Sequence, residues 1–121
     1  MQFPLKHFKL SEFDSPDAPG SGAKMQPKFL QMLDNARSLA GVSFKVNSGY
    51  RTEAHNAKVK GVKGSSHCQG WAADIHCTDG GQRFLIVNAL LKSGINRIGV
   101  YPTFIHADCD PTKPAQVIWV K

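Results

Sequence analysis

Two segments of the chain carry apolar side chains at helical spacing. In residues 26–40 the apolar positions line one side of a helix, and Gly41 follows as a cap. Residues 82–92 form a second amphipathic stretch, which ends at Ser93-Gly94. Both segments are therefore predicted to be helices that turn an apolar face toward a core.

Shorter stretches alternate between apolar and polar side chains or consist of small apolar residues, a pattern typical of strands. The candidates are residues 42–47, 71–77, 97–100, 104–109 and 117–120. The order of these elements predicts an α+β fold with a small antiparallel sheet and helices packed on one side of it. We expect residues 1–121 to form a single domain, because the length suits one compact unit.

The alternation in residues 71–77 has a chemical consequence. It places Asp74 and His76 on one face of the predicted strand and the apolar Ala73 and Ile75 on the other. The apolar face belongs in the core. Asp74 is then a carboxylate on a strand of small residues, facing an open side.

Two histidines are predicted to approach the same point. Gly70 allows a sharp turn, so that His67 can fold back toward Asp74. In residues 104–109 the alternation projects His106 outward, on a strand that can lie beside the first. Two imidazole nitrogens and a carboxylate oxygen, with water as the fourth ligand, suit catalytic zinc. A surface hydrogen bond between a histidine and an aspartate is the alternative, and the second histidine is what favours a metal.

Charge and cysteine content narrow the function classes. Fifteen basic and nine acidic side chains give a net charge of +6, which attracts polyanions such as nucleic acid or an anionic cell wall. No common nucleic-acid-binding signature is present, so we expect no specific nucleic-acid partner. Three cysteines without a CxxC pair argue against a disulfide framework or a zinc finger. We expect reduced thiols, two of them buried.

No apolar stretch approaches the length of a membrane span, and the N-terminus lacks the apolar run of a secretory signal. We therefore expect a protein made in the cytoplasm, with no membrane segment.

Several motifs follow one another in a specific order. They are Ser48-Gly49-Tyr50-Arg51, then Asn56, then the pattern S-x-H-x-x-G-x-A-x-D over residues 65–74, then Phe104-Ile105-His106-Ala107-Asp108. Together they resemble the zinc D-alanyl-D-alanine carboxypeptidase and L-alanoyl-D-glutamate endopeptidase family, which shares its fold with the hedgehog signalling domain. The opening, Phe8-x-x-Ser11-Glu12-Phe13, is similar to that of small phage-type members. The resemblance spans about residues 8–106.

The resemblance implies a hedgehog-like fold and a zinc ion (Zn2+) bound by His67, Asp74 and His106. It also implies that Arg51 lies at the site, where its guanidinium can hold a substrate carbonyl or carboxylate and stabilise developing negative charge. Ser66 either steadies the loop that bears His67 or touches the substrate.

The two tryptophans are assigned different roles. Trp71 lies next to the site in the sequence and either forms a wall of the substrate cleft or packs in the core. Trp119 is expected to be a buried residue that closes the sheet.

One departure from the family pattern concerns the general base. Several members have a glutamate three residues before the last histidine, and here that position is Thr103. We predict Asp108 as the base, because it shares the face of His106; the alternative is that Asp108 orients a ligand histidine. The further candidates are His76, followed by Asp110 and His55.

The function implied is hydrolysis of an amide bond in a peptidoglycan stem peptide, by a monomer of the carboxypeptidase or the endopeptidase type. A small chain without a signal suits a phage lysis protein, made in the host cytoplasm and acting on the cell wall after release or from a virion. Two alternatives stay open: a non-catalytic zinc-containing binding module of the same fold, and a basic nucleic-acid-binding protein with only weak, salt-sensitive binding.

Overall fold

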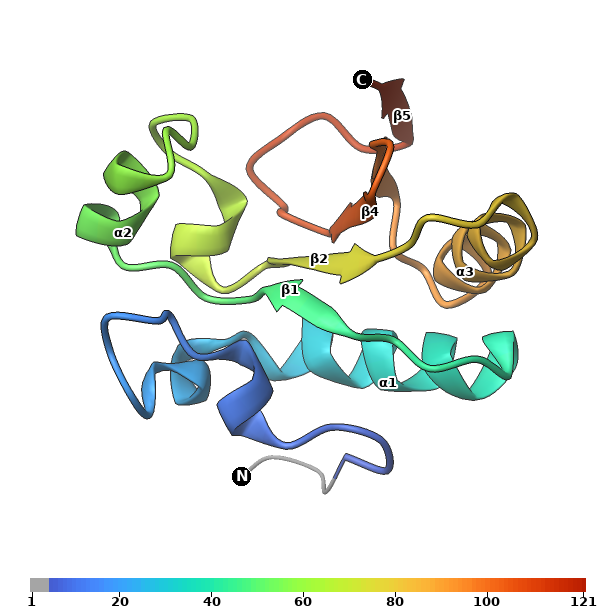
Figure 1. The fold of residues 1–121 in the computed structure, drawn as a ribbon, viewed down its shortest axis with the longest axis horizontal. Helices are drawn as coiled ribbons and strands as arrows, with labels where there is room; N and C mark the ends of the chain where they lie inside the picture. The colour runs from blue at the N-terminus through green and yellow to red at the C-terminus, as the bar shows by residue number, and fades with distance from the viewer. Residues whose placement is uncertain (1–4) are drawn as a thin grey trace.

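The computed structural model describes residues 5–121 and confirms the α+β class. Within this range, five strands form one sheet in the order β1-β2-β4-β3-β5, and the long helices α1 and α3 lie together on one side of it (Figure 1). The elements are η1 (Leu10–Phe13), η2 (Ser21–Lys24), α1 (Pro27–Ala40), β1 (Val46–Ser48), α2 (Glu53–Lys58), η3 (Ser66–Gln69), β2 (Ala72–His76), α3 (Gly80–Lys92), β3 (Arg97–Val100), β4 (Phe104–Asp108) and β5 (Val117–Val120), where η marks a 3-10 helix.

Helix α1 matches the prediction from its apolar spacing. It begins at Pro27, whose fixed φ suits the first helical position, and its apolar stripe is buried. It ends at Gly41, which adopts the left-handed conformation with φ of 70° and donates its N–H to the carbonyl of Arg37. Helix α3 begins earlier than predicted, at Gly80, because the Asp79 side chain caps it by accepting the N–H of Gln82 at 2.8 Å.

The prediction of an antiparallel sheet is correct for β1, β2, β4 and β3 and wrong for β5. Strand β5 pairs with β3 in parallel, with Val117 opposite Arg97 and Val120 opposite Val100. Strand β4 ends beside the start of β3, since Asp108 lies opposite Arg97. The connection over residues 109–116 then passes that end of β3, so that β5 starts where β3 starts and runs the same way.

Strand β1 is shorter than the alternation in residues 42–47 predicted. Only Val46–Ser48 pair with β2, and the register shifts between Val46 and Ser48. The preceding residues serve the core instead, where Phe44 is almost fully buried. Burial of a large apolar side chain stabilises the fold by about 1.5–3 kcal/mol, more than the roughly 1 kcal/mol net of one additional ladder hydrogen bond.

The two faces of the sheet differ in chemistry. Alternate residues of β2, β3 and β4 are fully buried against α1 and α3 and form the core together with the helices; they are Ala73, Ile75, Ile98, Ile105 and Ala107. As predicted, the three cysteines are free thiols, and Cys68 and Cys77 are buried. The other face of the same strands is left for polar side chains.

Among the helices of residues 5–121, none combines the length and the apolar character needed to span a bilayer.

Candidate metal centre

A single row of residues crosses the polar face of the sheet. Asp74 on β2 lies opposite His106 on β4, His106 lies opposite Gly99 on β3, and Gly99 lies opposite Trp119 on β5. Residues opposite one another in adjacent strands point to the same face. The register of the sheet therefore brings Asp74 and His106 together, as the alternation predicted.

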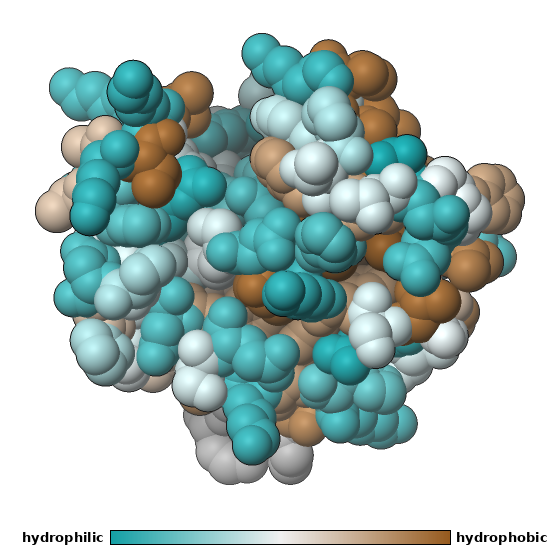
Figure 2. Space-filling model, in the orientation of Figure 1, coloured by the Kyte–Doolittle hydropathy of each residue, from teal (hydrophilic) through white to brown (hydrophobic). Residues whose placement is uncertain are grey.

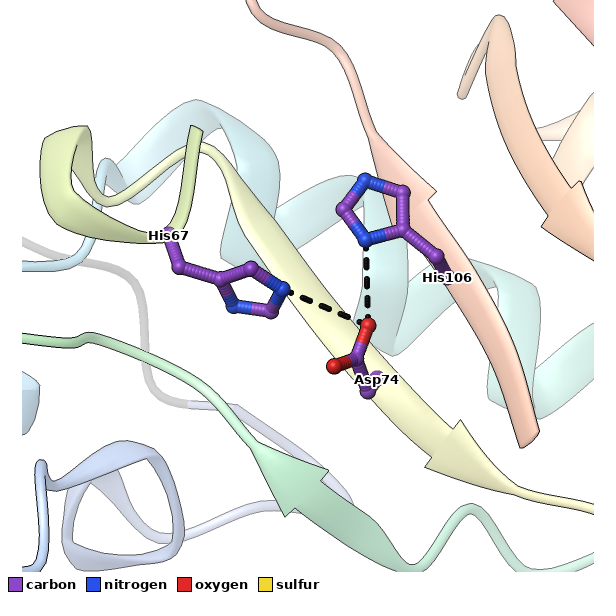
Figure 3. A group of neighbouring side chains, drawn as sticks. All are labelled: His67, Asp74 and His106. Atoms are coloured by element: carbon purple, nitrogen blue, oxygen red, sulfur yellow. Dashed lines mark hydrogen bonds and ion pairs between the residues drawn. The ribbon is translucent and has the colours of Figure 1, made fainter. Parts of the chain in front are cut away.

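His67 reaches this row from a short turn. The Ser65 side chain caps η3 by accepting the N–H of His67 at 3.2 Å, and Gly70 ends η3 with φ of 78°. A side chain at Gly70 would also collide with the carbonyl oxygen of Lys24, 2.6 Å from the position of a Cβ. The serine and glycine of the sequence motif thus form the turn that aims His67 at Asp74 (Figure 3).

The three predicted ligands converge. One carboxylate oxygen, Oδ1 of Asp74, lies 3.3 Å from Nε2 of His67 and 3.0 Å from Nδ1 of His106, as the dashed lines in Figure 3 mark. One donor atom from each residue lies within 4.8 Å of the others. His67 and Asp74 are buried, and His106 is half-buried. Two nitrogens and an oxygen this close are a donor set that fits zinc.

The outer nitrogen of each histidine has its own partner. Nδ1 of His67 lies 2.8 Å from the carbonyl oxygen of Gly49, and Nε2 of His106 lies 2.7 Å from Oδ2 of Asp108. Each partner oxygen accepts a hydrogen bond from the ring N–H. The two nitrogens that face Asp74 are thereby left to offer their lone pairs to a metal, which is how histidine ligands are commonly oriented.

The ionisation of the group follows from these contacts. Burial would raise the pKa of Asp74, but the hydrogen bonds and charges of His106 and His67 outweigh it and hold that pKa well below its usual range. Burial would lower the pKa of His106, but its bonds to Asp108 and Asp74 outweigh it and raise that pKa above 6.5. Without a metal, a proton on His106 balances the Asp74 carboxylate, and a bound cation would take over that role.

Arg51 lies at the site, as the resemblance implied. Its guanidinium donates to Oγ of Ser48 at 3.1 Å, to Oδ1 of Asn56 at 3.2 Å and to Oδ2 of Asp74 at 3.4 Å. Its backbone N–H donates to the carbonyl of His67 at 3.2 Å. Arg51 is therefore fixed at the edge of the ligand group, beside the oxygen of Asp74 that does not contact the histidines.

The ligand group opens into a cleft of about 530 Å³. One set of lining residues comes from the segment that follows α2, residues 59–67, and the other from β3, β4, β5 and their connections. Figure 2 shows a notch at the top of the view, between these two parts of the molecule. Five of the lining residues are basic and two are acidic; they are Arg51, Lys60, Arg97, Lys113 and Lys121, against Asp74 and Asp108. The ligand group is thus reached through an opening lined mostly by cationic side chains.

Asp108, predicted as the base, is only 1% exposed. Its Oδ1 accepts a hydrogen bond from Nε of Arg97 at 2.8 Å and another from the backbone N–H of Asp110 at 3.1 Å. Its Oδ2 contacts Nε2 of His106, the ring nitrogen turned away from Asp74. This placement favours the alternative, in which Asp108 orients His106. The role of Asp108 in proton transfer stays a prediction.

The other candidates for the base lie apart from the ligand group. His76 is exposed at the last position of β2, opposite Phe104, and does not line the cleft. Asp110 is buried, and its oxygens accept bonds from Ser66 and Thr112. His55 lines a smaller neighbouring cavity of about 180 Å³.

Ser66 belongs to a clasp that the sequence did not reveal, made of Ser66, Asp110 and Lys113. The Ser66 hydroxyl donates to Oδ2 of Asp110 at 2.8 Å, and Nζ of Lys113 donates to the Ser66 oxygen at 2.9 Å and to the carbonyl of Gly64 at 3.1 Å. The clasp joins the segment that bears His67 to the connection between β4 and β5. These contacts hold the loop that bears His67; Ser66 also lines the cleft, and its contact with a substrate stays a prediction.

Trp71 takes one of its two expected roles, whereas Trp119 does not take the role expected of it. Trp71 packs against the hydrophobic core, because it lies on the same side of the strand as Ala73 and Ile75, which face the helices. Trp119, expected to be buried, is half-buried and lines the cleft. The four residues of β5 are all apolar, so their alternation could not show which of them face the cleft.

An α+β domain with two histidines and an aspartate meeting at an open cleft defines a candidate metallohydrolase site. The family model of peptidase M15 matches residues 6–108, which include all three ligand residues, and the chain belongs to this family. Peptidases of this family are zinc enzymes, and the protein is accordingly a metallopeptidase with a His-Asp-His group that can hold the ion. Among curated proteins, none matches the chain.

Proposed function

We propose that this protein is a zinc-dependent peptidase that hydrolyses an amide bond in peptidoglycan stem peptides. The observation that carries the proposal is the convergence of His67, Asp74 and His106 at a cleft that also holds Arg51, in a chain of the peptidase M15 family. His67, Asp74 and His106 would hold the metal through the atoms that face one another. Zinc bound there would supply a Lewis acid for the scissile carbonyl and lower the pKa of water to about 7.

The residues of the chain prepare the site for that chemistry. Gly49 and Asp108 keep a proton on the outer nitrogen of each histidine, which fixes the ring orientation. Ser48 and Asn56 hold the guanidinium of Arg51 at the edge of the ligand group, so this side chain need not be ordered further when a substrate binds. In this position its guanidinium can bind a substrate carboxylate or carbonyl oxygen.

The cationic lining of the cleft supports an anionic peptide as substrate. Asp74 and Asp108 contact histidines and arginines, whereas Lys60 and Lys121 line the cleft on the two sides of the ligand group. Stem peptides of peptidoglycan carry several free carboxylates, which these cations would attract. The net charge of +6 would also favour adsorption to an anionic wall, and added salt would weaken it.

We propose that the protein is made in a host cytoplasm and acts as a monomer on the cell wall during phage-associated lysis, either after release or from a virion. The similarity of the first residues to small phage-type members supports this setting.

Digestion of purified peptidoglycan, followed by mass spectrometry of the soluble products, tests the activity. The zinc-loaded protein should release fragments cut at one amide bond, of the D-alanyl-D-alanine or the L-alanyl-D-glutamate type, and the fragment masses identify which. A chelator should stop the release, and added zinc should restore it. Absence of new fragments from several wall types, with zinc shown to be bound, would contradict the proposal.

A non-catalytic zinc-containing binding module is the second candidate. It is favoured by the cleft itself, where the carboxylates among the lining residues are the ligand Asp74 and the buried Asp108. Thr103, in the place of the family's usual glutamate, lies on an exposed turn and cannot accept a proton from water. The module would bind stem peptides and leave every amide bond intact, so the same digestion separates the two candidates.

A further inference from the structure

Beyond the metal ligands, the row across the sheet continues to an indole ring. Trp119 lies over Gly99, where an added Cβ would be 2.6 Å from Nε1 and Cε2 of the indole. Because residue 99 has no side chain, the ring can lie against the sheet and approach His106, with ring centroids 5.3 Å apart. The indole therefore occupies the part of the cleft next to the ligand group.

Two contacts hold the indole in this place. The guanidinium of Arg97 lies 5.5 Å from the ring centre, and Asp108 anchors that guanidinium through a bond of 2.8 Å. At its edge the indole N–H donates to the hydroxyl oxygen of Tyr101 at 3.1 Å. Asp108 thus orients His106 directly and the indole of Trp119 through Arg97.

The hydrogen bond from Trp119 leaves the hydroxyl proton of Tyr101 available for a second hydrogen bond. The phenol oxygen accepts the indole N–H, and within residues 5–121 no acceptor takes the phenol's own proton. The Tyr101 ring stacks on Phe104, with centroids 4.3 Å apart and planes 11° apart, so the phenol is already ordered. Tyr101, Phe104 and Trp119 all line the cleft. A fixed O–H that faces a cleft is a preorganised donor.

The strand order places this donor opposite Arg51. Arg51 contacts Asp74 on β2, whereas Trp119 is on β5, and β4 with His106 lies between them. We propose that Tyr101 and Trp119 form a substrate subsite: the phenol donates a hydrogen bond to a carbonyl or carboxylate oxygen of the peptide, and the part of the indole that lines the cleft contacts a small apolar side chain beside the scissile bond. This inference rests on the proposed function and assigns two binding residues to it.

Single-group substitutions test the subsite. Tyr101→Phe removes the hydroxyl and keeps the ring on Phe104, so kcat/KM on a soluble stem peptide should fall by about tenfold, mostly through KM, with the zinc content unchanged. Trp119→Phe removes the indole N–H and part of the platform and should lower kcat/KM at least as much. The double variant should lose less than the product of the two factors, because the indole acts partly through the phenol. Tyr50→Phe, at the other tyrosine, which packs against the core, is the matched control and should match the wild type.

The outcomes separate the subsite from the function on which it rests. If the wild type cleaves and Tyr101→Phe keeps its kcat/KM and KM, the subsite is refuted and the peptidase stands. If the zinc-loaded wild type cleaves nothing, peptidase action is refuted. Binding of the same peptide, followed by the change in tryptophan fluorescence as peptide is added, then tests the subsite. Binding by the wild type that weakens in Tyr101→Phe supports it, and equal binding or no binding overturns it.

Discussion

The two halves of the candidate metal centre are built differently. Asp74 and His106 are on neighbouring strands and lie opposite each other, so the backbone ladder of the sheet sets their separation. His67 is on a short turn, and its place depends on the Ser65 cap, the turn at Gly70 and the clasp of Ser66, Asp110 and Lys113. The strand half is therefore as rigid as the core behind it. The turn half is held in place by its local turn and by side-chain contacts with a segment distant in the sequence.

The largest effect is expected from loss of a ligand on the strand half. His106→Ala should keep the fold, because the sheet ladder does not use the side chain, but zinc affinity should fall by more than about 100-fold, the upper range for loss of an outer partner. Competition with a chromophoric chelator measures the affinity. His7→Ala is the control, because His7 contacts the Ser38 hydroxyl and does not line the cleft. Unchanged zinc binding in His106→Ala would remove the basis of the site.

Asp108 is the next test, because it separates orientation from proton transfer. Asp108→Ala should lower zinc affinity by about 10- to 100-fold, since Nε2 of His106 loses its acceptor. Asp108→Asn keeps an acceptor oxygen but no basic carboxylate. If Asp108 orients His106, the asparagine variant should keep more zinc affinity and more activity than the alanine variant.

The opposite result would restore Asp108 as the base. In that case both variants would lose turnover to the same extent, while the asparagine variant kept its zinc. Measuring bound zinc and kcat on the same preparations separates the two results.

A pH titration of zinc binding tests the protonation of His106, the histidine of the strand half. The raised pKa of His106 means that, without metal, its proton stays bound up to a pH above 6.5, the ordinary value for histidine. Zinc must displace this proton, so its apparent affinity should be full above the raised pKa and fall by about tenfold per pH unit below it. Calorimetry in buffers of different ionisation enthalpy should detect the released proton. A midpoint below 6.5 would contradict the contacts of His106 with Asp74 and Asp108.

The smallest effect is expected at the clasp of the turn half. Asp110→Ala removes the acceptor of Ser66 and the partner of Lys113, so the turn bearing His67 should become mobile. We expect zinc affinity to fall by roughly threefold to tenfold, less than for loss of a direct partner of a ligand. Thermal unfolding and hydrogen exchange of residues 65–70 would show whether the loss is local. A loss as large as that of His106→Ala would mean that the two halves are equally fragile.

The sequence was most informative where periodicity decides structure. The alternation in β2 and β4 put Asp74 and His106 on the polar face, and the helical spacing located α1 and most of α3. His67 and Asp74 could be named from the sequence because they lie in a motif whose serine and glycine form a turn, and His106 because the alternation of its strand puts it on the polar face.

What the sequence could not supply depends on pairing between distant segments. Ser66 and Asp110 are 44 positions apart, and nothing local marks them as partners. The parallel course of β5, and with it the place of Trp119, depends on where β4 ends relative to β3. Asp108 carries the same ambiguity, because spacing puts it near His106 without saying which ring nitrogen it meets.

The missing side chain at position 99 has a consequence for how this cleft can change. A methyl group there would occupy the space that the indole of Trp119 now fills. The ring would have to lift away from β3, so its nitrogen would part from the Tyr101 oxygen and the opening beside His106 would narrow. One alanine, on a strand that contributes no ligand of its own, would thus reshape which peptides can enter while the metal-binding atoms stay where they are.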